Sequence, residues 1–248
     1  MLTYESLIRD KRVAIVGPAM YMMNSRHGKE IDSFDTIVRL NRSCESIEKY
    51  KDDIGSRTDV LYSCLIEKNA NGGVIDIDRY KNEYKIKYVC APPTSNMKGL
   101  SNQTRFHDLV DEGKVKELNK HIPVRLIDHE FQNKIALSVD CRPNTGYLAI
   151  YDLIRLNPKE LKIFGFSFYL DGFIKGVKSG IQQEQNKSEE EFAVQCFTSK
   201  RHNQFNMWSI AKQTLTKHPV VSLDPTLTKI LQMKELSKET FKEIISTK

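Results

Sequence analysis

The chain has 248 residues, of which 40% are hydrophobic and 28% are charged, values that are ordinary for a folded globular domain. Its formal net charge of +6 fits an anionic ligand such as a nucleotide or an acidic sugar, and it also fits a weak contact with nucleic acid or a membrane surface. The apolar runs are far too short to cross a bilayer, and residues 1–11 lack the apolar core of a signal peptide.

The cysteines form an odd set without a CxxC pair: Cys44, Cys64, Cys90, Cys141 and Cys196. This spacing argues against a disulfide framework and against a structural zinc site. It favours a reducing compartment, so we expect a cytoplasmic protein without a transmembrane segment.

Short β-branched runs alternate along the chain with amphipathic stretches, which is typical of βα units around a mainly parallel sheet. Strands are predicted at residues 13–17, 36–41, 59–64, 86–91, 124–127, 161–166 and 220–223. No linker demands a domain boundary. The sequence therefore predicts one α/β domain over residues 1–248, with a Rossmann-like fold in which helices flank a mainly parallel sheet.

The clearest predicted helix covers residues 144–156, with Asn144 as its cap. Its apolar residues recur at helical spacing: Tyr147, Ile150, Tyr151 and Ile154. A second helix is predicted at 204–217, and a third near the C-terminus around Phe241. The very polar residues 178–191 show no helix or strand period, and we interpret them as a mobile surface loop or as a lid over a site.

The first candidate ligand-binding segment is the buried strand that ends at Gly17. A glycine there lets the backbone turn tightly and approach a ligand, at the position where nucleotides bind in a doubly wound sheet. The segment is neither GxGxxG nor a P-loop, so it supports neither a dinucleotide nor a triphosphate site. A plain turn is an equally good interpretation of this segment alone.

Two further segments place polar groups at predicted strand ends or helix starts. Asn41 ends a strand, where its amide suits a ribose or a base edge, although a strand-end turn explains it as well. Asn144, Thr145 and Gly146 open the predicted helix, whose unpaired amides make an anion site. Simple capping explains Asn144 but not the Thr-Gly pair after it.

With these segments in view, residues 13–62 and 143–166 resemble the L and S sialylmotifs of the sialyltransferase superfamily, glycosyltransferase family 29. The first likeness consists of VAIVG, then Gly28-x-x-Ile31-Asp32, VRLN and DIGSRT. The second consists of PNTG, where many members have PSTG, and IFGF. The order of these sequence elements, and the number of residues between them, agree with the family.

The resemblance implies a GT-A-like, metal-independent enzyme without a cofactor. It implies inverting transfer of an acidic sugar, of the sialic acid or Kdo type, from a CMP-sugar donor to a hydroxyl of a glycan or glycoconjugate acceptor, with no nucleic acid partner. The implied nucleotide contacts are Gly17, Pro18, Ala19, Asn41, Asn144, Thr145, Gly146, Phe166 and Tyr169. The family's catalytic base is a late histidine, and His202 occupies the similar position, after the S motif and before VVSLDPTL.

The chain departs from the family at several positions. Pro18 stands where many members have a nucleotide-binding Asn, and Met207 stands where members often carry Glu. The His-Tyr motif is missing, although Phe168 and Tyr169 lie nearby, and residues 11–12 are not the cysteine of the disulfide found in animal members. These departures, with no anchor or stem, resemble a compact microbial or viral branch; for a viral member, the location is the host cytoplasm.

Three alternatives remain open. The first is a metal-dependent enzyme with a UDP-sugar donor that uses the triplet Asp76-Ile77-Asp78, although such triplets arise readily by chance. The second is a degenerate module that binds a nucleotide or an acidic glycan without turnover, for which Pro18 and Met207 are the best support. The third is a basic nucleic-acid binder, which ranks last because no basic run alternates with aromatic residues.

Overall fold

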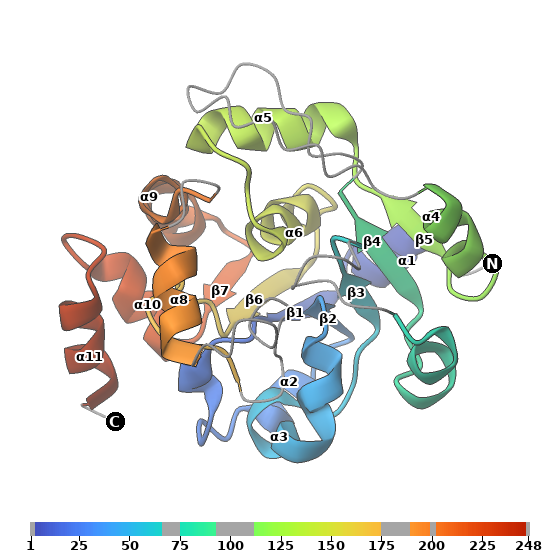
Figure 1. Ribbon diagram of the computed structural model, residues 1–248, viewed down its shortest axis with the longest axis horizontal. Helices are drawn as coiled ribbons and strands as arrows, with labels where there is room; N and C mark the ends of the chain where they lie inside the picture. The colour runs from blue at the N-terminus through green and yellow to red at the C-terminus, as the bar shows by residue number, and fades with distance from the viewer. Residues whose placement is uncertain (1–2, 66–74, 93–111, 175–188, 199–201, 247–248) are drawn as a thin grey trace.

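The computed structural model describes residues 3–65, 75–92, 112–174, 189–198 and 202–246. Within these ranges the chain forms a seven-stranded sheet with the order β5-β4-β3-β2-β1-β6-β7, and every neighbouring pair is parallel (Figure 1). The strands are β1 (Arg12–Val16), β2 (Thr36–Leu40), β3 (Val60–Tyr62), β4 (Tyr88–Ala91), β5 (Val124–Leu126), β6 (Glu160–Phe164) and β7 (Val221–Leu223). Each predicted strand overlaps one of them, so the predicted parallel α/β fold is confirmed.

The strand order contains one reversal of direction. The chain builds the sheet outward from β1 to β5, and then returns to place β6 on the other side of β1. Open parallel sheets bind their ligands at such a switch point, in the crevice beyond the carboxyl ends of the strands. The fold therefore places its expected site where β1 and β6 end.

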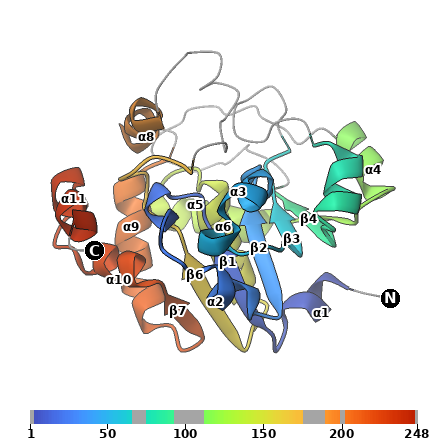
Figure 2. The same cartoon turned by 90° about the horizontal axis from the view of Figure 1, so that it is seen from below.

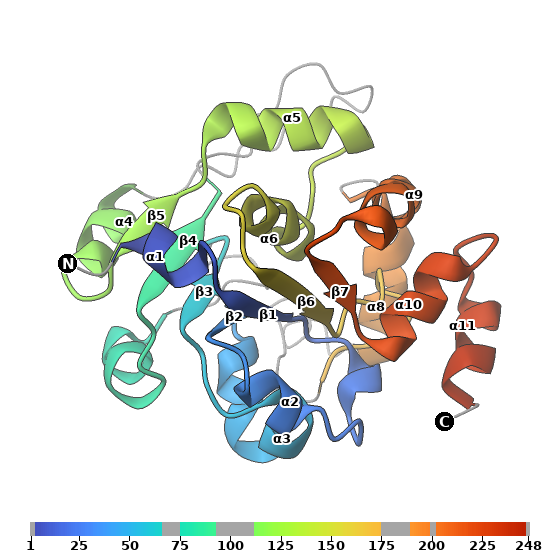
Figure 3. The same ribbon diagram turned by 180° about the vertical axis from the view of Figure 1, so that it is seen from behind.

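Helices cover both faces of the sheet. In the front and back views, α5, α6 and α9 lie on one face, and α2 and α3 lie on the other (Figures 1 and 3). The view from below shows α2 and α3 in front of the strands, with α4 beyond β4 and α11 at the opposite end (Figure 2). The α-helices are α1 (Tyr4–Ile8), α2 (Gly28–Asp32), α3 (Ile47–Ile54), α4 (Glu112–Asn119), α5 (His129–Val139), α6 (Thr145–Ile154), α8 (Glu189–Thr198), α9 (Gln204–Thr214), α10 (Pro225–Gln232) and α11 (Lys238–Ser246). Shorter turns of helix are η1 (Met20–Met22), η2 (Ser43–Ser46), η3 (Arg79–Glu83) and η4 (Leu215–Lys217).

The predicted helices occur where the sequence places them. Helix α6 fills most of 144–156, α9 with η4 covers 204–217, and α11 contains Phe241. The other α-helices were not predicted individually, among them α5 and α8. The prediction of a loop at 178–191 is wrong at its end, because residues 189–191 begin α8; residues 178–188 lie outside the described part of the chain.

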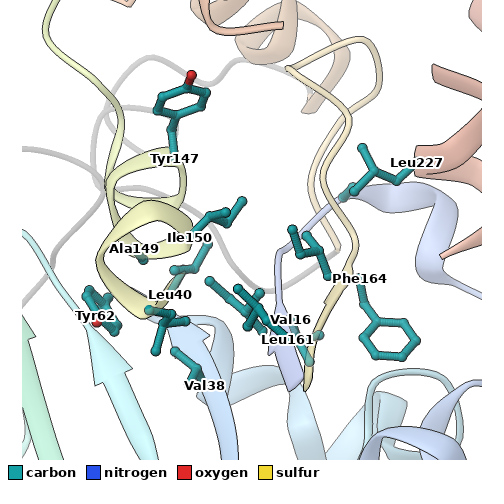
Figure 4. Close-up of a cluster of buried hydrophobic side chains, with 14 of the residues drawn as sticks. Val16, Val38, Leu40, Tyr62, Tyr147, Ala149, Ile150, Leu161, Phe164 and Leu227 are labelled. Atoms are coloured by element: carbon teal, nitrogen blue, oxygen red, sulfur yellow. The ribbon is translucent and has the colours of Figure 1, made fainter. Parts of the chain in front are cut away.

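The core lies on both faces of the sheet, and one part of it lies between α6 and the strands. Ala149 and Ile150 of α6 lie near Leu40 at the end of β2 (Figure 4), whereas the ring of Phe164 packs on the opposite face of the sheet, against His27 and Phe34. Every residue of β2 is buried, as expected for a strand covered on both faces. Full burial of an aliphatic or aromatic side chain contributes about 1.5–3 kcal/mol, so this contact holds α6 firmly above the strand ends.

None of the helices in the described ranges is both long and apolar enough to cross a lipid bilayer. The cysteines all lie within these ranges, and no disulfide joins any two of them.

Candidate active site

A cavity opens beyond the carboxyl ends of the central strands, at the switch point. Its wall combines residues that follow β1, β2 and β6 with the start of α6 and with His202, just before α9. Five stretches of chain supply most of this wall: 18–19, 40–42, 142–148, 165–169 and 171–173.

Two glycines at the floor of the cavity contact each other through their backbones. Gly17 follows β1 and Gly165 follows β6, and a β-carbon added at Gly17 would lie 2.3 Å from the carbonyl oxygen of Gly165. A β-carbon at Gly165 would lie 2.4 Å from the Gly17 oxygen, and Gly165 has a positive φ of 73°. Side chains are excluded at both positions, so the backbones of the two motif segments meet directly.

Phe166 connects these glycines to α6. A β-carbon at Gly17 would approach its ring to 3.0 Å, and one at Gly146 would approach it to 2.7 Å. The phenyl ring is therefore wedged between the end of β1 and the first turn of α6. Phe166 lines the cavity, and it also sets the distance between the two motif segments.

Backbone hydrogen bonds join the segment after β6 to the segment after β1. The amide of Ala19 donates to the Gly165 oxygen at 3.1 Å, and that of Met20 donates to the Gly172 oxygen at 3.0 Å. The Ile174 amide donates to the Pro18 oxygen at 2.9 Å. A proline at position 18 is compatible with this pairing because only its carbonyl is used.

Asn41 and Arg42 contribute polar groups from the end of β2. Asn41 adopts a left-handed backbone (φ 49°), which Asn tolerates better than most residues, and its Oδ1 accepts from the Cys64 amide at 3.3 Å. Arg42 is held by Glu45 through bonds of 2.9 and 2.7 Å, and this partner, despite an opposing effect of partial burial, raises the pKa of the guanidinium. Glu45 therefore holds the guanidinium of Arg42 in its charged form, in a fixed position beside Asn41.

The N-terminus of α6 opens into the cavity. The Asn144 side chain caps the helix by accepting from the Tyr147 amide at 2.8 Å. Thr145 and Gly146 are the first helical residues, whose amides have no partner within a helix, and both line the cavity. With the partial positive charge of the helix end, this is a favourable position for a phosphate.

His202 faces the same cavity from the segment before α9. Its Nδ1 lies 2.7 Å from the carbonyl oxygen of Arg142. Because a carbonyl can only accept, Nδ1 carries the proton, and in the neutral ring Nε2 carries the lone pair. The hydrogen bond fixes both the tautomer and the orientation of the imidazole.

Phe168 and Tyr169 line the cavity in an unusual backbone conformation. Both have positive φ, 52° and 59°, which is rare for bulky residues and costs about 1–2 kcal/mol each. Burial, and to a lesser extent Cys196 of α8, raises the pKa of the Tyr169 hydroxyl, so it remains a neutral donor. The ring of Tyr169 packs edge-on against Phe173, with 5.6 Å between centroids.

The structure brings the predicted site residues together. Every one of them lines the cavity except Gly17, which lies directly behind Phe166. The sequence analysis missed two cationic wall residues, Arg42, which directly follows the predicted contact Asn41, and Arg142, which lies two residues before the predicted contact Asn144. Gln132 of α5 was also missed, and no sequence pattern pointed to it because α5 itself was not predicted.

Of the features that supported the alternatives, Pro18 lines the cavity, whereas Met207, Asp76 and Asp78 lie elsewhere. Met207 is fully buried in α9 and belongs to the core. Asp76 accepts from the Arg79 amide at 3.0 Å and Asp78 accepts from the Asn82 side chain at 2.5 Å, so both stabilise η3, and neither lines the cavity. Within the described ranges, no three His, Cys, Asp or Glu side chains converge as metal ligands.

Two curated proteins similar to this chain are sialyltransferases. The α-N-acetylneuraminide α-2,8-sialyltransferases of Xenopus tropicalis and Xenopus laevis are each 31% identical over 117 residues. Each match covers 42% of this chain but only 31% and 30% of the respective relative, so this chain spans less than a third of their length.

Solved structures with the same fold are also sialyltransferases. The monofunctional α-2,3-sialyltransferase Cst-I of Campylobacter jejuni gives a TM-score of 0.53 at 12% identity, covering 96% of this chain and 83% of the other. A mammalian sialyltransferase in complex with Gal-beta-1-3GalNAc-ortho-nitrophenol gives 0.52 at 13%, covering 89% and 71%. At this identity the likeness establishes the fold.

The family assignment rests on a wider match. The model of glycosyltransferase family 29 (sialyltransferase) matches residues 7–168, well over half of the chain, and these residues include both motif segments and most of the cavity wall. The chain therefore belongs to glycosyltransferase family 29.

Proposed function

We propose that this chain transfers an acidic sugar, of the sialic acid or Kdo type, from a CMP-linked donor to a hydroxyl of a glycan or glycoconjugate acceptor. One observation carries the proposal: the N-terminus of α6 and the imidazole of His202 open on the same cavity at the switch point of the sheet. Membership of family 29 supports it, as does a solved structure of similar fold, a variant of the sialyltransferase Cst-II in complex with CMP, with a TM-score of 0.52.

The helix terminus supplies the phosphate site of the proposal. A CMP-sugar carries a single phosphate, and the amides of Thr145 and Gly146 with the helix dipole match its charge. The same groups stabilise the phosphate as it leaves with the bonding electrons, which is transition-state stabilisation by pre-oriented donors. We propose that no metal is required, because these amides and the guanidinium of Arg42 together stabilise the negative charge of the phosphate.

His202 acts as the general base in this proposal. The acceptor oxygen attacks the anomeric carbon while the bond from that carbon to the phosphate oxygen breaks, and CMP departs with the electron pair. The acceptor proton passes to Nε2 of His202, whose Nδ1–H remains on the Arg142 carbonyl. A single displacement from the opposite face inverts the anomeric centre, and a positioned base contributes about 10²–10⁴-fold to the rate.

Calorimetric titration tests the donor. We expect CMP to bind more tightly than UMP and far more tightly than UDP, with no change after treatment with EDTA. Equal or stronger binding of UDP, or loss of binding in EDTA, would overturn the donor assignment and favour the UDP-sugar alternative. Binding of CMP without release of CMP from CMP-sialic acid or CMP-Kdo, across a panel of acceptors, would favour a binding module without turnover.

A further inference from the structure

Two buried side chains outside the cavity wall bind the loop that forms part of it. Tyr21 lies in η1 and Asp224 caps α10, and they are 203 positions apart. The Tyr21 hydroxyl donates to Asp224 Oδ2 at 2.7 Å, and Asp224 is 1% exposed. Neither residue lines the cavity.

This pair binds two consecutive backbone amides at the end of β6. The Gly165 amide donates to Asp224 Oδ2 at 2.9 Å, and the Phe166 amide donates to the Tyr21 hydroxyl at 3.0 Å. Burial, reinforced by the adjacent Asp224 carboxylate, raises the pKa of Tyr21, so its hydroxyl keeps the proton that it donates. Hydrogen bonds to a charged acceptor away from water are stronger than those between neutral groups.

The same tyrosine also binds the far end of the loop. Its backbone amide donates to Asp171 Oδ2 at 2.8 Å. Residues 165–171 are therefore anchored at both ends to Tyr21, and between the anchors lie Phe168 and Tyr169 with their left-handed backbones. A strained conformation persists only where the surroundings over-determine it, and these anchors do so here.

We propose that Tyr21 and Asp224 are positioning residues that hold the loop 165–171 in its strained form, so that Phe166 and Tyr169 face the nucleotide. The inference rests on the proposed function and adds to it two residues that do not touch the substrate. We call the hydrogen bonds of Tyr21 and Asp224 to each other and to the amides of Gly165 and Phe166 the clamp. Loss of the clamp frees Phe166 from its place between Gly17 and Gly146. It therefore weakens nucleotide binding more than it slows the bond-breaking step.

The first test removes one hydroxyl. Tyr21→Phe deletes the donor to Asp224 and the acceptor for the Phe166 amide. Its matched control is Tyr62→Phe, because Tyr62 is also buried and its hydroxyl donates to another aspartate, Asp152, at 2.7 Å, and neither of these two residues lines the cavity. We expect a similar fall in melting temperature for both variants, but an approximately tenfold weaker affinity for CMP only in Tyr21→Phe.

The second test keeps the helix cap and disrupts the clamp. In the wild type the Leu227 amide donates to Asp224 Oδ1 at 2.8 Å. Asn and Asp cap helices equally well, so Asp224→Asn retains an acceptor for this amide. The side-chain NH2 group of the asparagine then replaces Oδ2 and faces the Gly165 amide, and because both groups are donors, this hydrogen bond is lost. The control is Asp128→Asn, which makes the same change at the exposed cap of α5.

Three measurements decide the matter: CMP affinity by calorimetry, donor KM and kcat, and hydrogen–deuterium exchange of peptides spanning 165–171. The clamp variants should raise Kd and KM by about tenfold, change kcat by less than about threefold, and accelerate exchange in this loop, while the controls should do none of these. Wild-type affinity and exchange in Tyr21→Phe would overturn the proposal, as would equal weakening in Tyr62→Phe. Failure of the wild type to bind CMP would refute the proposed function instead, and the exchange comparison, which needs no ligand, would still show whether the clamp holds the loop.

Discussion

At the scale of single residues, His202 and Gly17 perform different tasks at the same cavity. The imidazole is oriented for proton transfer by the Arg142 carbonyl, whereas Gly17 permits two strand ends to touch. The two positions can therefore be separated by what each substitution changes, the rate of turnover or the free energy of unfolding.

Replacing His202 by Ala should lower kcat by about 10²–10⁴-fold while CMP affinity changes little, because the base acts on the acceptor rather than on the nucleotide. Steady-state kinetics together with calorimetry check this. His129→Ala, at an exposed position of α5, is the control and should behave as wild type. Undiminished turnover in the His202 variant would remove its role as the base.

Replacing Gly17 by Ala should destabilise the protein by about 1–3 kcal/mol or more, because the new methyl group meets the Gly165 carbonyl and the Phe166 ring. Urea denaturation measures the change. Gly113→Ala, on the exposed side of α4, should have the opposite sign and stabilise by up to about 1 kcal/mol. A neutral Gly17 variant would show that the two strand ends separate without cost.

At the scale of elements, β2 and α3 are joined by a charge in the core. Arg39 lies in the middle of β2 with 0% exposure, and its guanidinium donates to the carbonyls of Ile54, Gly55 and Arg57 at 2.6, 3.1 and 3.0 Å. Burial lowers the pKa of this group to about 10, so it remains charged at neutral pH. The arginine therefore donates hydrogen bonds to carbonyls at and after the end of α3, which have no acceptor role within the helix.

Arg39→Met should cost about 2–4 kcal/mol of unfolding free energy, because three carbonyls, two of them in buried hydrogen bonds, lose their donor. Chemical denaturation gives the value. Arg57→Met serves as the comparison and should cost less, because that side chain is partly exposed and its carbonyl bonds have access to water. Equal losses in the two variants would mean that burial of Arg39 adds nothing to its contribution.

At the scale of the whole molecule, the core holds thiols in their neutral form. Burial raises the pKa of Cys44 and of Cys90 from an ordinary value of 9.0 to about 12. The folded state therefore keeps protons that the unfolded chain releases above pH 9. This contribution to stability is complete below pH 9, and it is lost as the pH rises from 9 toward 12.

The free energy of unfolding should accordingly fall between pH 8 and pH 10. In Cys90→Ala the fall should be smaller by about 1 kcal/mol, because one buried thiol no longer resists ionisation. Urea denaturation at a series of pH values checks both statements. An identical pH dependence in Cys90→Ala and wild type would show that the folded thiol ionises as readily as the unfolded one.

The elements of this protein follow from its local sequence. The central strands were predictable because a strand buried on both faces is a run of apolar residues, and the partly buried edge strands β5 and β7 were predictable from their short β-branched runs. Helix α6 was predictable because its apolar residues recur at helical spacing. The motif segments around Gly17, Asn41 and Asn144 were likewise visible, since strand ends and helix caps have local signatures. Helix α5 was not predicted, although Phe131, Ile135 and Val139 recur in it at helical spacing and Asp128 caps its start.

The tertiary structure alone decided how these pieces meet. The contact between Gly17 and Gly165 depends on β6 returning to the side of β1, and the clamp of Tyr21 and Asp224 joins residues 203 positions apart. Residue patterns report short-range preferences, whereas contacts between distant segments depend on the packing of the whole chain. The candidate residues could therefore be named from the sequence, but the cavity that unites them, its wall residue Arg142 and its supporting clamp could not.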